Sequence, residues 1–123
     1  MLKKLLAIMK KEGYGDLKFG IPGNVKPLAP VIGSDLKVPH IGWNSLKINP
    51  ESKLFAGIPE ESYVYFVHSY YLQAEDISSV VATTEYGVNI HASVEKGNVF
   101  ACQFHPEKSS DVGLQILKNF VEL

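Results

Sequence analysis

The sequence predicts an α/β fold in a single domain, with a strand-rich centre and a helix at each end. The middle of the chain, from residue 62 to residue 104, is dense in aromatic and β-branched residues, which favour strands. Both ends instead carry apolar residues at helical spacing. The chain has 123 residues, of which 46% are hydrophobic and 20% charged, so it is long enough for one folded domain and is not typical of a disordered segment.

The first element predicted is an amphipathic helix over residues 2–12. Leu2, Leu5, Leu6 and Met9 recur at helical spacing, and the lysines lie largely off that stripe. The helix is expected to end near Gly13. Residues 18–38, which are rich in Gly and Pro, then predict short strand pieces joined by turns.

The second half predicts four strands and a terminal helix. The strands are expected at residues 62–68, 80–84, 88–94 and 98–104, with a hairpin turn at Glu95–Gly97 in which Gly97 takes a positive φ. Ser109 or Ser110 can cap the last helix, whose apolar stripe comprises Val112, Ile116, Leu117, Phe120 and Val121. Two helices cannot cover both faces of five or six strands, so we expect the sheet to lack covering partners.

Charge and cysteine content exclude several classes of protein. The net charge is −1 and all twelve basic residues are Lys, so the basic excess typical of a nucleic-acid binder is missing. A single Cys excludes an intrachain disulfide framework and a Cys-rich zinc site. The lone thiol, with no signal sequence recognised, favours a cytoplasmic setting. No stretch is apolar for long enough to predict a membrane span.

The segment Gln103–Lys108 is the sharpest candidate for chemistry. Pro106 restricts His105 to extended geometry, and in extended chain residues two apart project to the same side. Glu107 can therefore accept a hydrogen bond from one imidazole nitrogen of His105, which leaves the other nitrogen as a general base. From spacing alone, a strand-end His with a solvated Glu is the commoner interpretation.

Cys102 and the remaining histidines give weaker signals. A Cys near a His suggests a nucleophile, but Cys102 and His105 lie three apart on an extended strand and face opposite sides. A small buried residue is the favoured interpretation of Cys102. The four His are scattered without metal-ligand spacing, so no metal and no cofactor are predicted.

Two aromatic strings leave alternatives open. Val38–Asn44 holds the only Trp, Trp43, which is either a core residue or an interface anchor. Tyr65–Tyr71 leaves a strand into a turn, where backbone N–H groups can hold a small carboxylate. The alternative for this second string is a strand end with its aromatic rings in the core.

Together, Phe104–Ser109, Pro39–Asn44 and Tyr65–Tyr70 resemble the class I glutamine amidotransferase family. Within that family they look like the glutaminase subunits of imidazole-glycerol-phosphate synthases, which serve histidine biosynthesis. The resemblance runs from about Leu5 to the C-terminus and is strongest from Val38 onward. It implies a mostly parallel sheet between helix layers, and an enzyme that hydrolyses glutamine and passes ammonia to a cyclase subunit.

The resemblance also implies roles for single residues. His105 and Glu107 would be the base and the orienting acid of a Cys-His-Glu triad. Backbone groups at Ser69 and Tyr70 would hold the α-carboxylate of glutamine. The residues that would face the cyclase partner are Trp43, Asn44, Tyr65 and Lys108.

The family's nucleophile string, Gly-x-Cys-x-Gly, does not occur in this sequence. We therefore expect residues 1–123 to form a single partial domain without the nucleophile-bearing N-terminal part, inactive by itself. The alternatives are a docking module without chemistry, an isolated remnant, and a fragment of another class I amidotransferase. We also expect a homo-oligomer through an exposed sheet edge, with an apolar patch that includes some of Val64, Phe66, Val80 and Val81.

Overall fold

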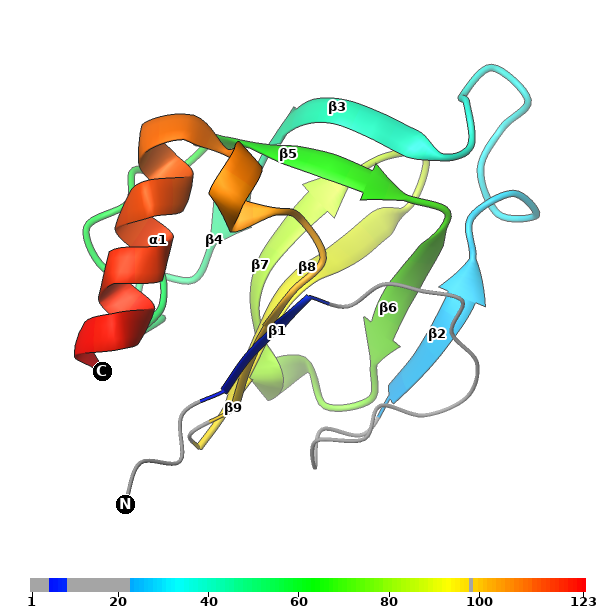
Figure 1. The fold of residues 1–123 in the computed structure, drawn as a ribbon. Coiled ribbons are helices and arrows are strands. Elements are labelled where there is room, and N and C mark those ends of the chain that lie inside the picture. The colour runs from blue at the N-terminus through cyan, green and yellow to red at the C-terminus, as the bar shows by residue number, and fades with distance from the viewer. Residues whose placement is uncertain (1–4, 9–22, 98) are drawn as a thin grey trace.

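Strands make up most of the structure, a computed structural model that describes residues 5–8, 23–97 and 99–123. In chain order the elements are β1 (Leu5–Ile8), β2 (Gly23–Pro27), β3 (His40–Ser45), β4 (Lys47–Ile48), β5 (Tyr63–His68), β6 (Tyr70–Ala74), the 3₁₀ turn η1 (Ile77–Ser79), β7 (Val80–Glu85), β8 (Asn89–Lys96), β9 (Val99–Cys102), the 3₁₀ turn η2 (Pro106–Lys108) and α1 (Ser110–Glu122) (Figure 1). The four strands and the terminal helix predicted for the second half are confirmed.

A five-stranded sheet in the order β1-β9-β8-β7-β4 forms the centre of the described structure. Strands β1 and β9 run parallel, whereas the other neighbours in this sheet are antiparallel. The β8–β9 pair is antiparallel because β8 passes into β9 through a tight turn in which Gly97 has a φ of 60°. The described sheet is therefore not the mostly parallel one that the resemblance implies.

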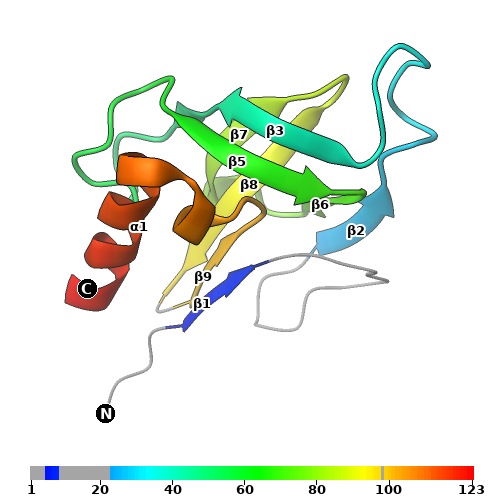
Figure 2. The same cartoon turned by 45° about the horizontal axis from the view of Figure 1, so that its top comes forward.

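Two antiparallel ribbons accompany the sheet. One pairs β2 with β6, and the other pairs β3 with β5. Figure 2 shows the β3–β5 ribbon lying across one side of the sheet, with α1 beside it. The register places His40 opposite His68 and Trp43 opposite Tyr65, so residues far apart in sequence become neighbours across the ribbon.

Both faces of the sheet are covered by the chain itself. Phe100 and Cys102 face a core that includes Ile116 of α1, whereas Val94 on the other face packs with Leu72 of β6. The expected apolar patch is not exposed at the residues named for it, so that expectation is wrong there. Val64, Phe66 and Val81 are buried, and Val80 is half-buried. A ribbon can cover a sheet face as a helix does, which counting helices alone overlooked.

The N-terminal helix prediction is wrong where the structure describes it. Residues Leu5–Ile8 form strand β1, which pairs with Val99–Cys102. Four consecutive apolar residues fit a helix face and a buried strand equally well, and the free edge of β9 decides in favour of the strand. The other residues of the predicted helix lie outside the described ones. The fold class stands as strand-rich α/β, and among the described residues the one α-helix is α1, at the C-terminal end.

None of the helices among the described residues is long and apolar enough to cross a membrane.

Candidate functional site

The segment after β9 is held to strand β5 by two hydrogen bonds, and a third bond closes the segment on itself. The N–H of His105 donates to the carbonyl of Tyr65 at 3.0 Å. In return, the N–H of Tyr65 donates to Ser109 Oγ at 3.0 Å, and Ser109 Oγ donates to the carbonyl of His105 at 2.7 Å. Ser109 occupies the N-cap position of α1, but its side chain makes no capping bond. The predicted capping residue therefore fixes the backbone of His105.

Close packing at the start of α1 tightens the same segment. A Cβ placed on Gly113 would lie 1.8 Å from the carbonyl oxygen of Pro106, so only glycine fits there. Because the helix approaches so closely, the turn Pro106–Lys108 rests directly on its first turns. The local backbone of the dyad is thus fixed by the core and does not depend on its exposed side chains.

His105 and Glu107 lie together, as their spacing predicts. His105 Nδ1 and Glu107 Oε2 are 3.1 Å apart, and the two side chains are 18% and 52% exposed. Burial acts to raise the pKa of Glu107, but its own backbone N–H, the hydrogen bond from His105 and the charges of His105 and Lys108 together lower that pKa. The prediction of contact is confirmed, and the catalytic roles of the two residues stay predictions.

This geometry fixes what the imidazole can do. An ionised carboxylate only accepts, so Nδ1 of His105 carries the proton that it shares with Glu107. Nε2 of neutral His105 then holds a lone pair that can take a proton from an acid. The carboxylate stabilises the imidazolium that results, as the third member of a catalytic triad does.

The corner Ser69–Tyr70 joins β5 to β6 near the dyad. Its carbonyls are fixed by two bonds: Leu28 N–H donates to the Ser69 carbonyl at 2.9 Å, and His68 Nδ1 lies 2.7 Å from the Tyr70 carbonyl. Burial lowers the pKa of His68, the bond to Tyr70 opposes that shift, and the charge of His105 lowers the pKa further. The corner and the dyad are both attached to β5, since the N–H of His105 donates to Tyr65 of that strand.

One group near this corner was missed by the sequence analysis. His40 Nδ1 lies 2.9 Å from His68 Nε2, and both rings are buried. The residues are 28 positions apart, so no local sequence pattern predicts their contact. A correct β3–β5 register, with both residues at the same end of the ribbon, is the signal that would have found them.

Cys102 has the environment of a core residue. Its side chain is fully buried, with Sγ 3.8 Å from Ser93 Oγ. Burial raises the pKa of the Cys102 thiol to about 12; the Ser93 hydrogen bond opposes this and the charge of Glu95 adds to it. A thiol held neutral in the core is a poor nucleophile. The interpretation of Cys102 as a small buried residue is confirmed.

Residues predicted to face a partner lie on the β3–β5 ribbon and beside the dyad. Trp43 is 52% exposed and meets Tyr65 edge-on, with ring centroids 5.9 Å apart. Lys108 is exposed directly after Glu107. Residues on the ribbon that are also exposed but were not predicted are Ile41, Tyr63 and Val67. In strands, alternate residues share a face, so these side chains and Trp43 form one outward aromatic and aliphatic surface.

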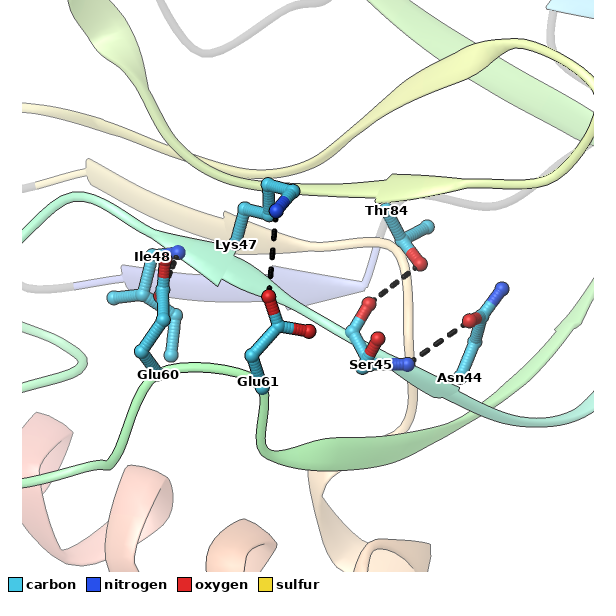
Figure 3. Close-up of polar contacts among 7 residues, drawn as sticks. All are labelled: Asn44, Ser45, Lys47, Ile48, Glu60, Glu61 and Thr84. Carbon is cyan, nitrogen blue, oxygen red and sulfur yellow. Dashed lines mark hydrogen bonds and ion pairs between the residues drawn. The ribbon is translucent and has the colours of Figure 1, made fainter.

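Asn44 differs from the other predicted partner residues, because its side chain is engaged within the chain. Asn44 Nδ2 donates to the carbonyl of Glu85 at 3.0 Å, and Asn44 Oδ1 accepts from Ser45 N–H at 2.9 Å. Beside it, Thr84 Oγ1 donates to the Ser45 carbonyl at 2.8 Å (Figure 3). These bonds tie the end of β3 to β7, so Asn44 anchors the ribbon to the sheet.

The loop before β5 anchors strand β4 through two acidic side chains. Lys47 Nζ lies 3.3 Å from Glu61 Oε2, and Ile48 N–H donates to Glu60 Oε1 at 2.6 Å (Figure 3). The ion pair is largely exposed, so it contributes little to stability. Within the part of the chain that the structure describes, no group of three or more His, Cys, Asp or Glu is arranged to hold a metal ion.

The sequence of the chain matches a known protein family. The model of the family described as glutamine amidotransferase class-I matches residues 16–123. An imidazole glycerol phosphate synthase subunit HisH of Synechococcus is 54% identical over 104 residues, which cover 83% of this chain and 47% of that protein. The HisH subunit of Archaeoglobus fulgidus is 46% identical over 122 residues, covering 98% of this chain and 59% of the relative.

A solved structure supports the fold independently of close sequence similarity. A Thermoplasma acidophilum protein, named for a GMP synthase subunit, superposes with a TM-score of 0.63 at 21% identity, over 85% of this chain and 48% of its own. The chain spans about half the length of the relatives it matches. Since the family model covers most of the sequence, the chain belongs to the class-I glutamine amidotransferase family.

Proposed function

We propose that this chain carries the base half of a glutaminase, which hydrolyses glutamine and delivers ammonia to a cyclase subunit in histidine biosynthesis. The observation that carries the proposal is the contact of 3.1 Å between His105 Nδ1 and Glu107 Oε2. It is supported by the identity to relatives named as imidazole glycerol phosphate synthase subunits. We propose a cytoplasmic setting because the chain holds a single cysteine, which is typical of a reducing compartment.

In this mechanism, His105 Nε2 takes the proton of a cysteine thiol, and the thiolate attacks the side-chain amide carbon of glutamine. The imidazolium then returns the proton to the leaving nitrogen, so ammonia departs and a thioester remains. Water hydrolyses the thioester to glutamate and frees the thiol. Glu107 keeps Nδ1–H of His105 aligned throughout. We assign the α-carboxylate of glutamine to the Ser69–Tyr70 corner.

The thiol in this scheme comes from outside the present sequence. Cys102 is the one cysteine of the chain, and its side chain is fully buried with a pKa that burial raises to about 12. We therefore propose that residues 1–123 act as a partial domain, completed by a segment that carries the nucleophile. The purified chain is expected to release no glutamate from glutamine, and a Cys102→Ser variant should behave identically. Release that disappears in the variant would make Cys102 catalytic.

A graft tests the assignment of the base directly. Residues 16–123 would replace the matching part of the Archaeoglobus fulgidus relative, and glutamate release would be measured with the cyclase subunit of that organism present. We expect activity with the unchanged graft and a loss of about a thousandfold or more with His105→Asn. The unmodified relative is the positive control. A folded graft that is inactive, or whose activity survives His105→Asn, would contradict the proposal.

A second role, docking, is favoured by the exposed side chains on the β3–β5 ribbon. Trp43 is the kind of aromatic residue that dominates binding energy at interfaces, and it stands next to Tyr65, whose backbone holds His105. We propose that this surface and Lys108 face the cyclase subunit, which would bring the dyad to the ammonia exit. Trp43→Ala should weaken binding to the cyclase subunit by at least tenfold, while His91→Asn, away from this surface, should not.

A further inference from the structure

The mechanism proposed above makes no use of the buried pair formed by His40 and His68. They are the first residue of β3 and the last residue of β5, and they stand opposite each other in the register of the ribbon. His40 is 3% exposed and His68 is 5% exposed. Two imidazoles buried together with defined hydrogen bonds constitute a specific arrangement, because each ring nitrogen needs a partner of the right kind.

Hydrogen-bond chemistry assigns the protons of this pair. The carbonyl of Tyr70 can only accept, so His68 Nδ1, at 2.7 Å from it, must carry a hydrogen. In neutral His68 the other nitrogen, Nε2, is then an acceptor. His40 Nδ1, at 2.9 Å from that Nε2, must therefore donate. The result is a directed chain of bonds from His40 through His68 to the Tyr70 carbonyl.

The ring of His40 is held firmly at the start of this chain. It stacks on Tyr86 with centroids 3.8 Å apart and on Phe66 with centroids 4.8 Å apart, both at an interplanar angle of 15°. Tyr86 is itself fixed, because its hydroxyl donates to the carbonyl of Lys37 at 2.5 Å. A ring fixed by stacking gives its N–H a fixed direction, which is what a positioning group requires.

The chain of hydrogen bonds ends at the Ser69–Tyr70 corner. Leu28 N–H fixes the Ser69 carbonyl at 2.9 Å, and in a trans peptide this also sets the opposite direction of the Tyr70 N–H. His68 fixes the Tyr70 carbonyl and so sets the next peptide plane. The two successive peptide planes of the corner are thus held by groups from outside it.

We propose that His68, aligned by His40, is a positioning residue that fixes the Ser69–Tyr70 corner for a substrate carboxylate. The carboxylate as ligand rests on the proposed function, whereas the positioning rests on the hydrogen bonds alone. The pair acts in its neutral form. The titratable groups that the structure places against it are the two imidazoles themselves, Tyr86 on His40, and His105, whose charge acts on His68. Burial, then the charge of His68, lowers the pKa of His40 to about 4, which is consistent with a neutral pair.

Amide hydrogen exchange on the full chain tests the positioning. Leu28 N–H reports on the corner, and Gln103 N–H, which donates to the Ala92 carbonyl at 2.8 Å, reports on the sheet. His40→Phe keeps the stack but removes the donor, and should speed exchange at Leu28 about fivefold to tenfold with no change at Gln103. His40→Asn, which keeps an N–H donor near the position of Nδ1, should restore exchange to within about twofold of the original rate.

The matched control is His91→Asn, at another buried histidine, whose Nδ1 accepts from Ala74 N–H at 3.0 Å. It should leave the ratio of exchange rates at Leu28 and Gln103 unchanged. Unaltered exchange at Leu28 in His40→Phe, or equal acceleration at Gln103, would overturn the proposal. Long-range ¹H–¹⁵N spectra of the unmodified chain give a second decision: Nδ1–H on both His40 and His68 supports it, and Nε2–H on His68 refutes it.

L-Glutamate, the carboxylate-bearing product of the proposed reaction, separates this inference from the proposed function. Added to the chain, it should shift the amide signals of Ser69 and Tyr70, and His40→Phe should weaken that binding about fivefold to tenfold. If L-glutamate shifts neither amide in the unmodified chain, the ligand assignment fails while the exchange result still decides the positioning. Equal affinity in both proteins would show that the pair does not serve the ligand.

Discussion

The two histidine sites of this molecule differ in what surrounds the imidazole, although both depend on strand β5. His105 is 18% exposed and faces a carboxylate, whereas the ring of His68 is buried and faces another imidazole and a carbonyl. A carboxylate favours the imidazolium that appears during proton transfer, and burial without one disfavours it. The hydrogen-bond partner of the imidazole and its access to solvent therefore distinguish His105, a candidate base, from His68, a positioning group.

The two sites are also held differently. The backbone of His105 is fixed by Tyr65 and Ser109, and its side chain contacts the exposed carboxylate of Glu107. In the pair, the side chains themselves are the fixing elements, so a proton gained there would remove the acceptor at His68 Nε2. We expect acid to disturb the pair and to leave the frame of His105 intact.

The largest effect on stability is expected from Gly113→Ala, which acts on the frame of His105. The new methyl would lie 1.8 Å from the Pro106 carbonyl, so helix and turn must separate. We expect a loss of about 3 kcal/mol in the free energy of unfolding, measured by urea denaturation. Gly33→Ala is the control, because a Cβ there meets only Asp35 N at 4.0 Å. A Gly113→Ala protein within about 0.5 kcal/mol of the original would show that the contact is not rigid.

Acid should act mainly on the buried pair. The pKa of His40 falls from 6.5 to about 4 on folding, through burial first and the charge of His68 second, so the unfolded chain binds a proton more readily than the folded one. The contribution of neutral His40 to the free energy of unfolding is therefore fully present above pH 6.5 and is lost as the pH falls toward 4. Between pH 7 and pH 5 we expect the free energy of unfolding to drop by about 2 kcal/mol from His40 alone.

His40→Phe isolates this contribution. Removing the titrating group should flatten the fall between pH 7 and pH 5, leaving the smaller losses from His68 and His91, whose pKa values burial also lowers. Urea denaturation at several pH values measures the slope. An unchanged slope in the variant would mean that His40 is not the group that titrates.

Ser109→Ala should cost less than either, because it removes hydrogen bonds without a clash. The hydroxyl accepts from Tyr65 N–H and donates to the His105 carbonyl, and Ser109 is fully buried. We expect a loss of about 1–2 kcal/mol, since the partly buried N–H of Tyr65 would lose its partner. In NMR spectra of the variant, the signals of His105 and Glu107 should broaden or shift, while those of His40 and His68 should stay in place. Changes of equal size at both sites would show that they are not held separately.

The contrast also explains which parts were predictable from sequence. The His105–Glu107 contact follows from a spacing of two residues around Pro106, and the hairpin at Gly97 follows from local turn chemistry. Such contacts depend on a few adjacent residues, so their pattern is visible in the chain. The roles of those residues depend on a nucleophile and a substrate, and these came only from the family resemblance.

Contacts between distant residues were not predictable in the same way. Strand β1 forms because β9, more than ninety residues later, offers it an edge, and the local pattern of Leu5–Ile8 equally favours a helix. The His40–His68 bond needs the register of β3 against β5, which no turn motif between them fixes. Burial of Phe66 and Val64 likewise depends on how the ribbon folds over the sheet. Each error arose where pairing across the fold decides.

The smallest effect predicted concerns the charge of Glu107. Although burial acts to raise its pKa, its backbone N–H, the hydrogen bond from His105 and the charges of His105 and Lys108 lower it overall. In His105→Asn the imidazolium is absent, so the pKa of Glu107 should rise toward its ordinary value. Carbonyl ¹³C titration of the side chain measures this shift, and Lys108→Gln should produce a smaller one, because Lys108 is the last of the contributing groups. Since Glu107 is half exposed, neither variant should change the free energy of unfolding beyond about 0.5 kcal/mol. A Glu107 that titrates identically with and without His105 would mean that the carboxylate does not sense the imidazole, and the distinction between the two histidine sites would then rest on exposure alone.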